Sequence, residues 1–288
     1  MILPFAPSAH LGAAPLVLAL VAMAGYAVAA LPGQGASRLP APALVGAWLL
    51  HAVLLVLDIG GWGVLFPDEA PGARLGFGPV LSLTVWLVLA VHTVESRFVP
   101  LPGVRRVMAL NGVLAVLLAW AFPGEVHAAL SPVAPLHWLL GVASYALFGA
   151  AVLHATMLDA AERQMRLRAA PGSGLIGQAS GPMGMPLLRL ERLTFRFVEA
   201  GFAALTAALL LGIATARSSG LHWRWDHKWA FSLMGWAVFA ALLWGRHRRG
   251  WRGRRATRWL YVGAVLLLLA YVGSRFVFEV VLGRSVSG

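Results

Sequence analysis

The sequence predicts an all-α, polytopic membrane protein, a bundle of eight transmembrane helices with both chain ends on the outer (periplasmic) side. Of the 288 residues, 59% are hydrophobic and only 12% are charged, whereas a soluble domain carries about 25% charged residues. Mean hydropathy is +0.77. The apolar residues form continuous runs instead of the short alternating segments of a membrane barrel. These observations exclude a soluble globular protein.

Eight apolar runs approach the roughly 20 residues that a helix needs to cross the hydrocarbon core. Lipid offers no hydrogen-bond partners, so each spanning segment must satisfy its own backbone and is expected to be helical. No Lys or Arg precedes the first run, which we expect to be retained. The runs are Leu11–Leu31, Ala41–Leu57, Phe77–Thr93, Val104–Phe122, Pro135–Leu158, Phe197–Ala216, Trp229–Gly245 and Trp259–Val281.

The loop charges predict the orientation of this bundle. Of the 23 Lys and Arg residues, 17 fall in one set of alternate loops and six fall outside it. Because inner loops carry an excess of Lys and Arg, we expect the first set inside and both chain ends outside. The net charge of +12 then reflects orientation and contact with anionic membrane lipids, and nucleic acid is not an expected partner.

The sequence contains no motif of an enzyme. No two carboxylates share a span, and neither a GxSxG elbow nor an HExxH zinc motif occurs. The absence of cysteine excludes disulfides and thiolate metal ligands. Gly172, Gly174 and Gly177 match a dinucleotide-binding spacing, but they lie in a Gly-, Pro- and Ser-rich stretch with no strand before it. We therefore interpret that stretch as a linker and expect no enzymatic activity.

The most informative stretch is the outer loop before the seventh run, with the first residues of that run. Flat indole rings offer a stacking surface for a planar ligand, cations pair with carboxylates, and a neutral imidazole coordinates metals. Heme has the three matching properties: it is planar and apolar, it carries carboxylates, and it holds a metal at its centre. The residues are His222, Trp223, Arg224, Trp225, Asp226, His227, Lys228, Trp229 and, further on, Trp236.

An interfacial aromatic belt with snorkelling cations uses the same residue types, so composition leaves both interpretations open. His137 begins the fifth run on the outer side, and a ligand held between it and a loop histidine would lie at the outer rim. His51 lies mid-membrane, where a hydrogen bond to a neighbouring helix is the more common role and ligation the rarer one. The Arg-rich connection at residues 245–258 is interpreted as a lipid anchor, with a cytoplasmic partner as the alternative.

The outer loop resembles the tryptophan-rich signature of the cytochrome c assembly family, the heme handlers of the CcsA, CcmC and CcmF type. The family loop reads approximately W-x-W-D-P-K-E-x-W-S-L-x-x-W. His227, Trp229 and Phe231 depart from it. The matching residues, all in one register, are Trp223, Trp225, Asp226, Lys228, Ser232, Leu233 and Trp236.

The resemblance extends over about half of the chain and is closest to the short, eight-span HemX/YpjD-like branch. His137 with residues 144–146 is similar to an H-x6-S-Y-A segment whose His is an external heme ligand in the family. Residues 250–254 are similar to its G-W-R-G-R turn. Longer members carry a second external His after the span that follows the signature, and a membrane-embedded His within that span. Here the tail 279–288 contains no His, and Trp244 takes the embedded position.

The resemblance implies a bacterial inner-membrane protein that holds a non-covalent, b-type heme during cytochrome c assembly, alongside other assembly proteins. His137 would be one axial ligand, and His227 or His222 the second. Residues 1–133 would form four N-terminal helices, and residues 134–288 the assembly-like domain. The missing second His favours an alternative, an accessory or regulatory subunit (of tetrapyrrole synthesis or a transporter) without tightly bound heme. The expected platform and orienting residues are Trp223, Trp225, Trp229, Trp236, Arg224, Lys228 and Asp226.

Overall fold

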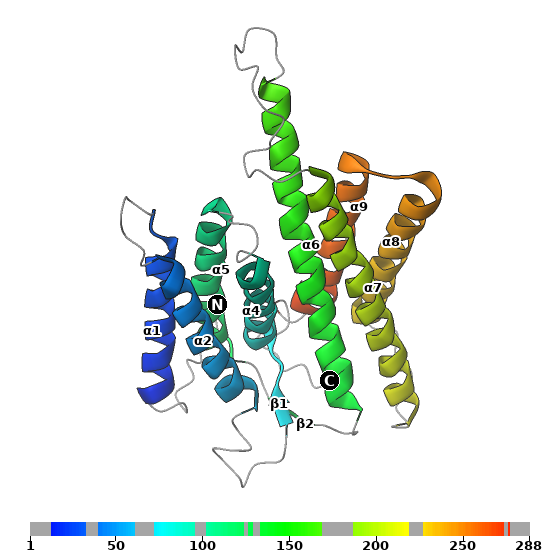
Figure 1. Ribbon diagram of the computed structural model, residues 1–288. Helices are drawn as coiled ribbons and strands as arrows, with labels where there is room; N and C mark the ends of the chain where they lie inside the picture. The colour runs from blue at the N-terminus through cyan, green and yellow to red at the C-terminus, as the bar shows by residue number, and fades with distance from the viewer. Residues whose placement is uncertain are drawn as a thin grey trace, which may run out of the picture.

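The computed structural model describes residues 13–32, 40–60, 72–95, 102–123, 126–128, 133–168, 187–218, 227–273 and 276. In this part of the chain eight α-helices form a bundle (Figure 1), which confirms the all-α class. The helices are α1 (Ala13–Ala30), α2 (Pro40–Leu55), α4 (Phe77–Glu95), α5 (Pro102–Ala121), α6 (Ala134–Arg168), α7 (Leu187–Ser218), α8 (His227–Arg249) and α9 (Gly253–Leu268). Short π-helical turns, η1 (Val56–Gly60) and η2 (Leu269–Gly273), extend α2 and α9.

The described helices support multiple membrane crossings. Seven are long and apolar enough to span a bilayer, and the apolar part of the eighth, Pro15–Ala30 in α1, is shorter. The protein is therefore a multi-pass membrane protein. Which end of the bundle faces outward stays a prediction from the loop charges.

Several helices are longer than their apolar runs. The fifth run ends at Leu158, whereas α6 continues to Arg168 and projects beyond the bundle in Figure 1. Likewise α7 begins at Leu187, ten residues before the predicted start. An apolar run marks the part of a helix that contacts lipid, but strong helix formers such as Ala, Glu, Gln, Met and Arg extend the helix into water. Hydropathy therefore located the spans and not the helix ends.

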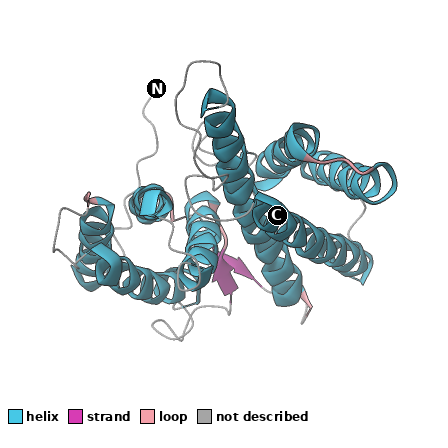
Figure 2. Cartoon of the chain, turned by 45° about the horizontal axis from the view of Figure 1, so that its top comes forward, coloured by secondary structure: helices cyan, strands magenta, loops and turns pink. Residues whose placement is uncertain are grey.

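A small antiparallel ladder was not expected from the sequence. Strand β1 (Gly72–Arg74) pairs with β2 (Val126–Ala128), with Ala73 opposite His127. The strands precede α4 and α6 and lie at one end of the bundle, between its two groups of helices (Figure 2). We call this end the sheet end. The opposite end, which carries the turn between α8 and α9, is called the arginine end.

The helices pack in two groups that share a boundary along α4 and α6. Helices α1, α2, α4 and α5 bury one cluster of apolar residues, to which α6 and α7 also contribute at one end, and α6 to α9 bury another. The boundary is close, because a Cβ added to Gly149 of α6 would lie 3.0 Å from Val88 of α4. At the sheet end Tyr271 of η2 donates a hydrogen bond to the carbonyl of Leu75, at 2.7 Å. The position of the C-terminal helices is thus tied to the loop before α4.

His51 joins three helices of the first group. Its side chain is 1% exposed, and the nearest polar atoms are the Tyr26 hydroxyl of α1, 3.0 Å from Nδ1, and the Ser82 hydroxyl of α4, 2.7 Å from Nε2. Both ring nitrogens are therefore hydrogen-bonded to neighbouring helices. The geometry agrees with the structural role that the sequence favoured for His51.

Replacing His51 with alanine is expected to lower the free energy of unfolding by about 2–4 kcal/mol, because it removes two buried hydrogen bonds and leaves a cavity. Tyr26→Phe removes one of these bonds and should cost about 1 kcal/mol. Unfolding of the purified protein in mixed detergent and SDS micelles measures both changes. Equal stability of wild type and His51→Ala would contradict the structural role.

Candidate functional site

His137 lies in the first turn of α6 at the sheet end and is half-buried. Its Nδ1 atom is 2.8 Å from the backbone carbonyl oxygen of Ala208 in α7. A carbonyl only accepts hydrogen bonds, so Nδ1 must carry the proton and donate it. In the neutral ring Nε2 then keeps its lone pair. Thus α7 fixes both the orientation and the tautomer of the imidazole.

A glycine of α7 makes room for this ring. A Cβ added to Gly212 would lie 3.0 Å from Cε1 of His137 and 3.7 Å from Cη2 of Trp229. The imidazole from α6 and the indole from α8 therefore both pack around one backbone position of α7. The structure thus brings together two of the predicted site residues, which are 92 positions apart in the sequence.

The first turn of α8 also contains Lys228, which like Trp229 is half-buried. Helix α8 begins at His227, so the last residues of the tryptophan-rich signature are helical. The helix therefore begins two residues before Trp229, the predicted start of the span. The loop cation and the indole enter the bundle on a helix, which holds backbone positions more firmly than a loop would.

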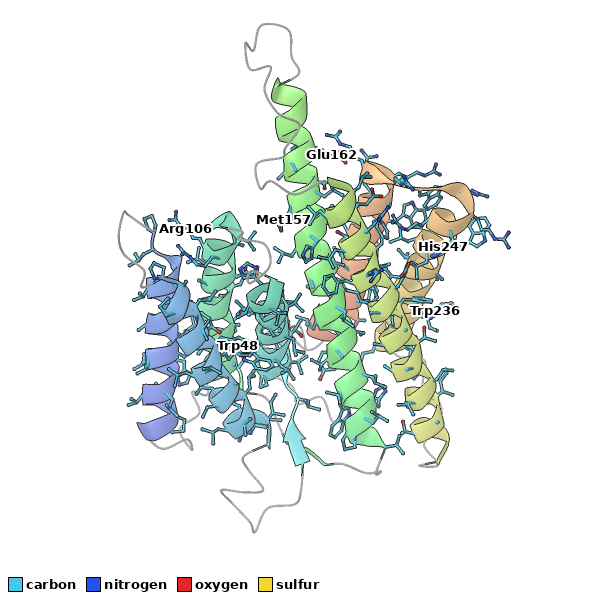
Figure 3. All side chains as sticks on the ribbon, viewed as in Figure 1. Trp48, Arg106, Met157, Glu162, Trp236 and His247 are labelled. Carbon is cyan, nitrogen blue, oxygen red and sulfur yellow. The ribbon has the colours of Figure 1, made fainter. Side chains whose placement is uncertain are left out.

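Trp236 occupies a different environment, about 10 Å further along α8 by helical rise. Its indole N–H donates a 3.0 Å hydrogen bond to the Thr206 hydroxyl, and its ring stacks on Phe202 with centroids 5.5 Å apart. Figure 3 shows Trp236 between α7 and α8. This tryptophan anchors α8 to α7, a contact that the sequence alone did not indicate.

The H-x6-S-Y-A segment of α6 also has a structural explanation. The Ser144 hydroxyl donates to the carbonyl of Gly141 at 2.7 Å, and the Tyr145 hydroxyl donates to the carbonyl of Leu267 in α9 at 2.6 Å. Tyr145 thus connects α6 to α9 across the second group of helices. The Tyr145 contact helps to hold the helix that carries His137 in place.

The remaining predicted residues lie outside the described part of the chain. This applies to the loop residues and to the side chain of His227, although its backbone begins α8. Their convergence on His137 stays a prediction. The loop residues concerned are His222, Trp223, Arg224, Trp225 and Asp226.

The sequence did not indicate that Ala208 and Gly212 contribute to the site. The carbonyl of Ala208 carries no side-chain signal, and no role in a site was predicted for Gly212. Their spacing of four residues puts them one turn apart on one face of α7. A glycine that faces a histidine of a neighbouring helix can be recognised only once it is known that the two helices pack together.

These features define a class: a multi-pass helical membrane protein with a half-buried, tautomer-fixed histidine at the sheet end. Residues 47–282 match the cytochrome C assembly protein family, and the chain belongs to that family. It is 30% identical over 279 residues to the inner membrane protein YpjD of Escherichia coli K12, covering 92% of this chain and 99% of that protein.

Other relatives extend the comparison. The cytochrome c biogenesis protein CcsA of Synechococcus sp. CC9605 is 29% identical over 296 residues, 94% of each chain. CcsA of Gloeobacter violaceus is 37% identical over 91 residues, 31% of this chain and 27% of that protein. No solved structure matches this chain.

Proposed function

We propose that this protein handles heme in cytochrome c assembly, as an inner-membrane protein without enzymatic activity. It holds a b-type, non-covalent heme at the sheet end, which is the periplasmic end in the predicted orientation. The observation that carries the proposal is the hydrogen bond from Nδ1 of His137 to the carbonyl of Ala208. That bond leaves Nε2 as the metal-binding atom.

The side chains around His137 are of the chemical kinds that hold a porphyrin. Metal-binding histidines typically donate their second ring N–H to a carbonyl or carboxylate, which fixes the ring and raises its basicity. The nearby Trp229 indole provides a flat apolar surface, and the half-buried Lys228 provides a cation for a propionate. A bound heme would supply an iron centre able to change its oxidation state. The protein's part is to bind, orient and shield that group.

We propose that His227 would be the second residue to hold the heme iron, with His222 as the other choice. His227 begins the helix that carries Trp229, so its backbone lies within one turn of the indole beside His137. Trp223 and Trp225 would complete the stacking surface with Trp229 and Trp236, while Arg224, Lys228 and Asp226 set the orientation of the ligand. Other cytochrome c assembly proteins would receive or deliver the heme.

One observation favours a second function, an accessory or regulatory membrane subunit without tightly bound heme. Trp244, which takes the place of the family's membrane-embedded His, is 53% exposed on α8, and Arg249 lies over its ring. That position faces outward from the bundle and is not part of an internal site. Such a protein would act on tetrapyrrole synthesis or on a transporter.

The absorption spectrum of the protein, purified in detergent from heme-replete cells, separates the two functions. Heme handling predicts a Soret band that is present at purification or develops on adding hemin. It also predicts a weaker band in His227→Ala. A preparation that stays without a Soret band after hemin addition would refute heme handling and favour the accessory role.

A further inference from the structure

Six exposed arginines surround the turn between α8 and α9 at the arginine end. Figure 3 shows nitrogen-bearing side chains gathered at this end of the two helices. Every cation of the group is arginine, whose planar guanidinium pairs with phosphate through two hydrogen bonds, whereas the lysine ammonium is a point charge. We call the group the arginine surface: Arg248, Arg249, Arg252, Arg254, Arg255 and Arg258.

Two acidic groups near this surface, Glu191 and Asp159, hold the helices together. Glu191 of α7 forms a 3.1 Å ion pair with Arg246, which is not part of the arginine surface. Asp159 of α6 accepts hydrogen bonds from the hydroxyls of Tyr261, at 2.8 Å, and Thr257, at 3.4 Å. These contacts fasten α8 and α9 to α6 and α7. Glu162 of α6 also lies at the turn, with Oε1 3.6 Å from the position of a Cβ added to Gly253. The six exposed arginines outnumber this carboxylate, so the surface keeps a net positive charge.

The turn itself has a fixed shape. Gly250 and Gly253 adopt φ values of +65° and +56°, which favour glycine. Between them the chain folds back, so that the N–H of Trp251 donates to the carbonyl of Gly245 at 3.2 Å and the indole covers that glycine. A side chain at Gly245 would overlap the ring. The G-W-R-G-R run is therefore a compact turn that holds the backbone of its arginines in fixed places.

Two of these arginines are stacked on tryptophans. The guanidinium carbon of Arg249 lies 4.6 Å from the ring centroid of Trp244, and that of Arg255 lies 4.3 Å from Trp251. A guanidinium over an aromatic face is held by the ring and can still direct N–H groups toward a ligand. The stacking therefore prepares two anion-binding groups, one on each side of the turn.

The arginine surface lies where the bundle leaves the hydrocarbon. The apolar spans of α8 and α9 end at Arg249 and begin at Gly253. Trp244, just inside that limit, is 53% exposed, and exposed tryptophans prefer the level of the lipid headgroups. The stacked pair of Trp244 and Arg249 is thus continuous with the lipid-facing surface, which favours a lipid over a soluble acidic protein.

We propose that the two stacked guanidiniums, on Arg249 and Arg255, form a binding site for the phosphate headgroups of anionic phospholipids. This goes beyond general membrane attraction, because it assigns the binding to two oriented side chains. It is independent of heme binding. It holds for whichever leaflet contains the arginine end.

Lipid binding to the detergent-purified full-length protein tests the proposal. Native mass spectrometry during titration with phosphatidylglycerol, and separately with phosphatidylcholine, gives the two affinities. We expect wild type to prefer phosphatidylglycerol and the double variant Arg249→Gln/Arg255→Gln to lose about tenfold in affinity for it. Arg106→Gln is the matched control, because Arg106 is an exposed arginine at the same end in the other group of helices. Its affinity should equal that of wild type.

A further double variant, Arg249→Lys/Arg255→Lys, separates geometry from charge, and we expect it to bind clearly more weakly than wild type. The proposal is overturned if wild type has no preference for phosphatidylglycerol, or if either double variant binds it as wild type does. An equal loss in Arg106→Gln would also overturn it, since it would show diffuse attraction. Displacement of bound phosphatidylglycerol by millimolar inorganic phosphate would overturn the lipid as ligand and assign the site to free phosphate.

Discussion

The variant His137→Ala is expected to lose the Soret band of the purified protein entirely, whether heme is acquired in the cell or added as hemin. The imidazole is the proposed metal-binding group, and the structure orients it, since its Nδ1 proton is committed to the carbonyl of Ala208. Alanine offers no lone pair in its place. An absorption spectrum normalised to protein concentration measures the loss.

His247→Ala is the matched control for that experiment. The imidazole of His247 also directs Nδ1 to a backbone carbonyl, that of Leu243, at 2.8 Å. It is exposed and lies near the arginine end of α8 (Figure 3). Removing it should leave the Soret band unchanged. A full-strength band in His137→Ala, or equal losses in both variants, would show that heme binds elsewhere.

Gly212→Ala is expected to weaken heme binding by about tenfold without unfolding the protein. The added methyl group would lie 3.0 Å from Cε1 of His137, closer than ordinary contact, so the imidazole must shift by a few tenths of an ångström, which disturbs its hydrogen bond to Ala208. Disturbing a bond that orients a metal ligand typically costs tenfold to a hundredfold, roughly, in affinity. Hemin titration followed by absorbance measures the change.

Gly141→Ala serves as the control, because Gly141 lies one turn from His137 on α6 and a Cβ there meets nothing within 4 Å. Its affinity for hemin should equal that of wild type. A heme-free measurement, the ¹⁵N chemical shifts of His137, should show a proton on Nδ1 in wild type and a changed signal in Gly212→Ala. If the shifts change but neither the wild type nor any variant binds heme, Gly212 does position the imidazole of His137 and the proposed function is wrong. Unchanged shifts and an unchanged affinity for hemin in Gly212→Ala would contradict the positioning of His137 by Gly212.

The number and place of the membrane spans followed from sequence because lipid acts on every residue of a span alike. Seven of the eight predicted runs coincide with helices long and apolar enough to cross, and the eighth coincides with α1. The ends of the helices were harder to predict from the sequence. Residues 159–168 contain charges that end a hydrophobic run, yet they continue α6 as good helix formers.

The site was predictable in its residue types and only partly in its geometry. His137 and Trp229 were singled out by their chemistry, and both are found around Gly212. Trp236 was assigned to the same platform by its place in the signature, but only the fold revealed its bond to Thr206. A tryptophan in a motif can serve a ligand, a neighbouring helix or both, and the sequence does not distinguish them.

By itself, the sequence determined that this chain is a helical membrane bundle of the cytochrome c assembly type, because hydropathy, loop charge and a local motif are written in consecutive residues. Only the tertiary structure decided which nitrogen of His137 carries the proton, since its partner is a backbone carbonyl 71 positions away. The same holds for His51, whose two partners come from different helices. The physical reason is that hydrogen bonds and close packing between helices depend on which faces meet, and no single helix encodes that pairing.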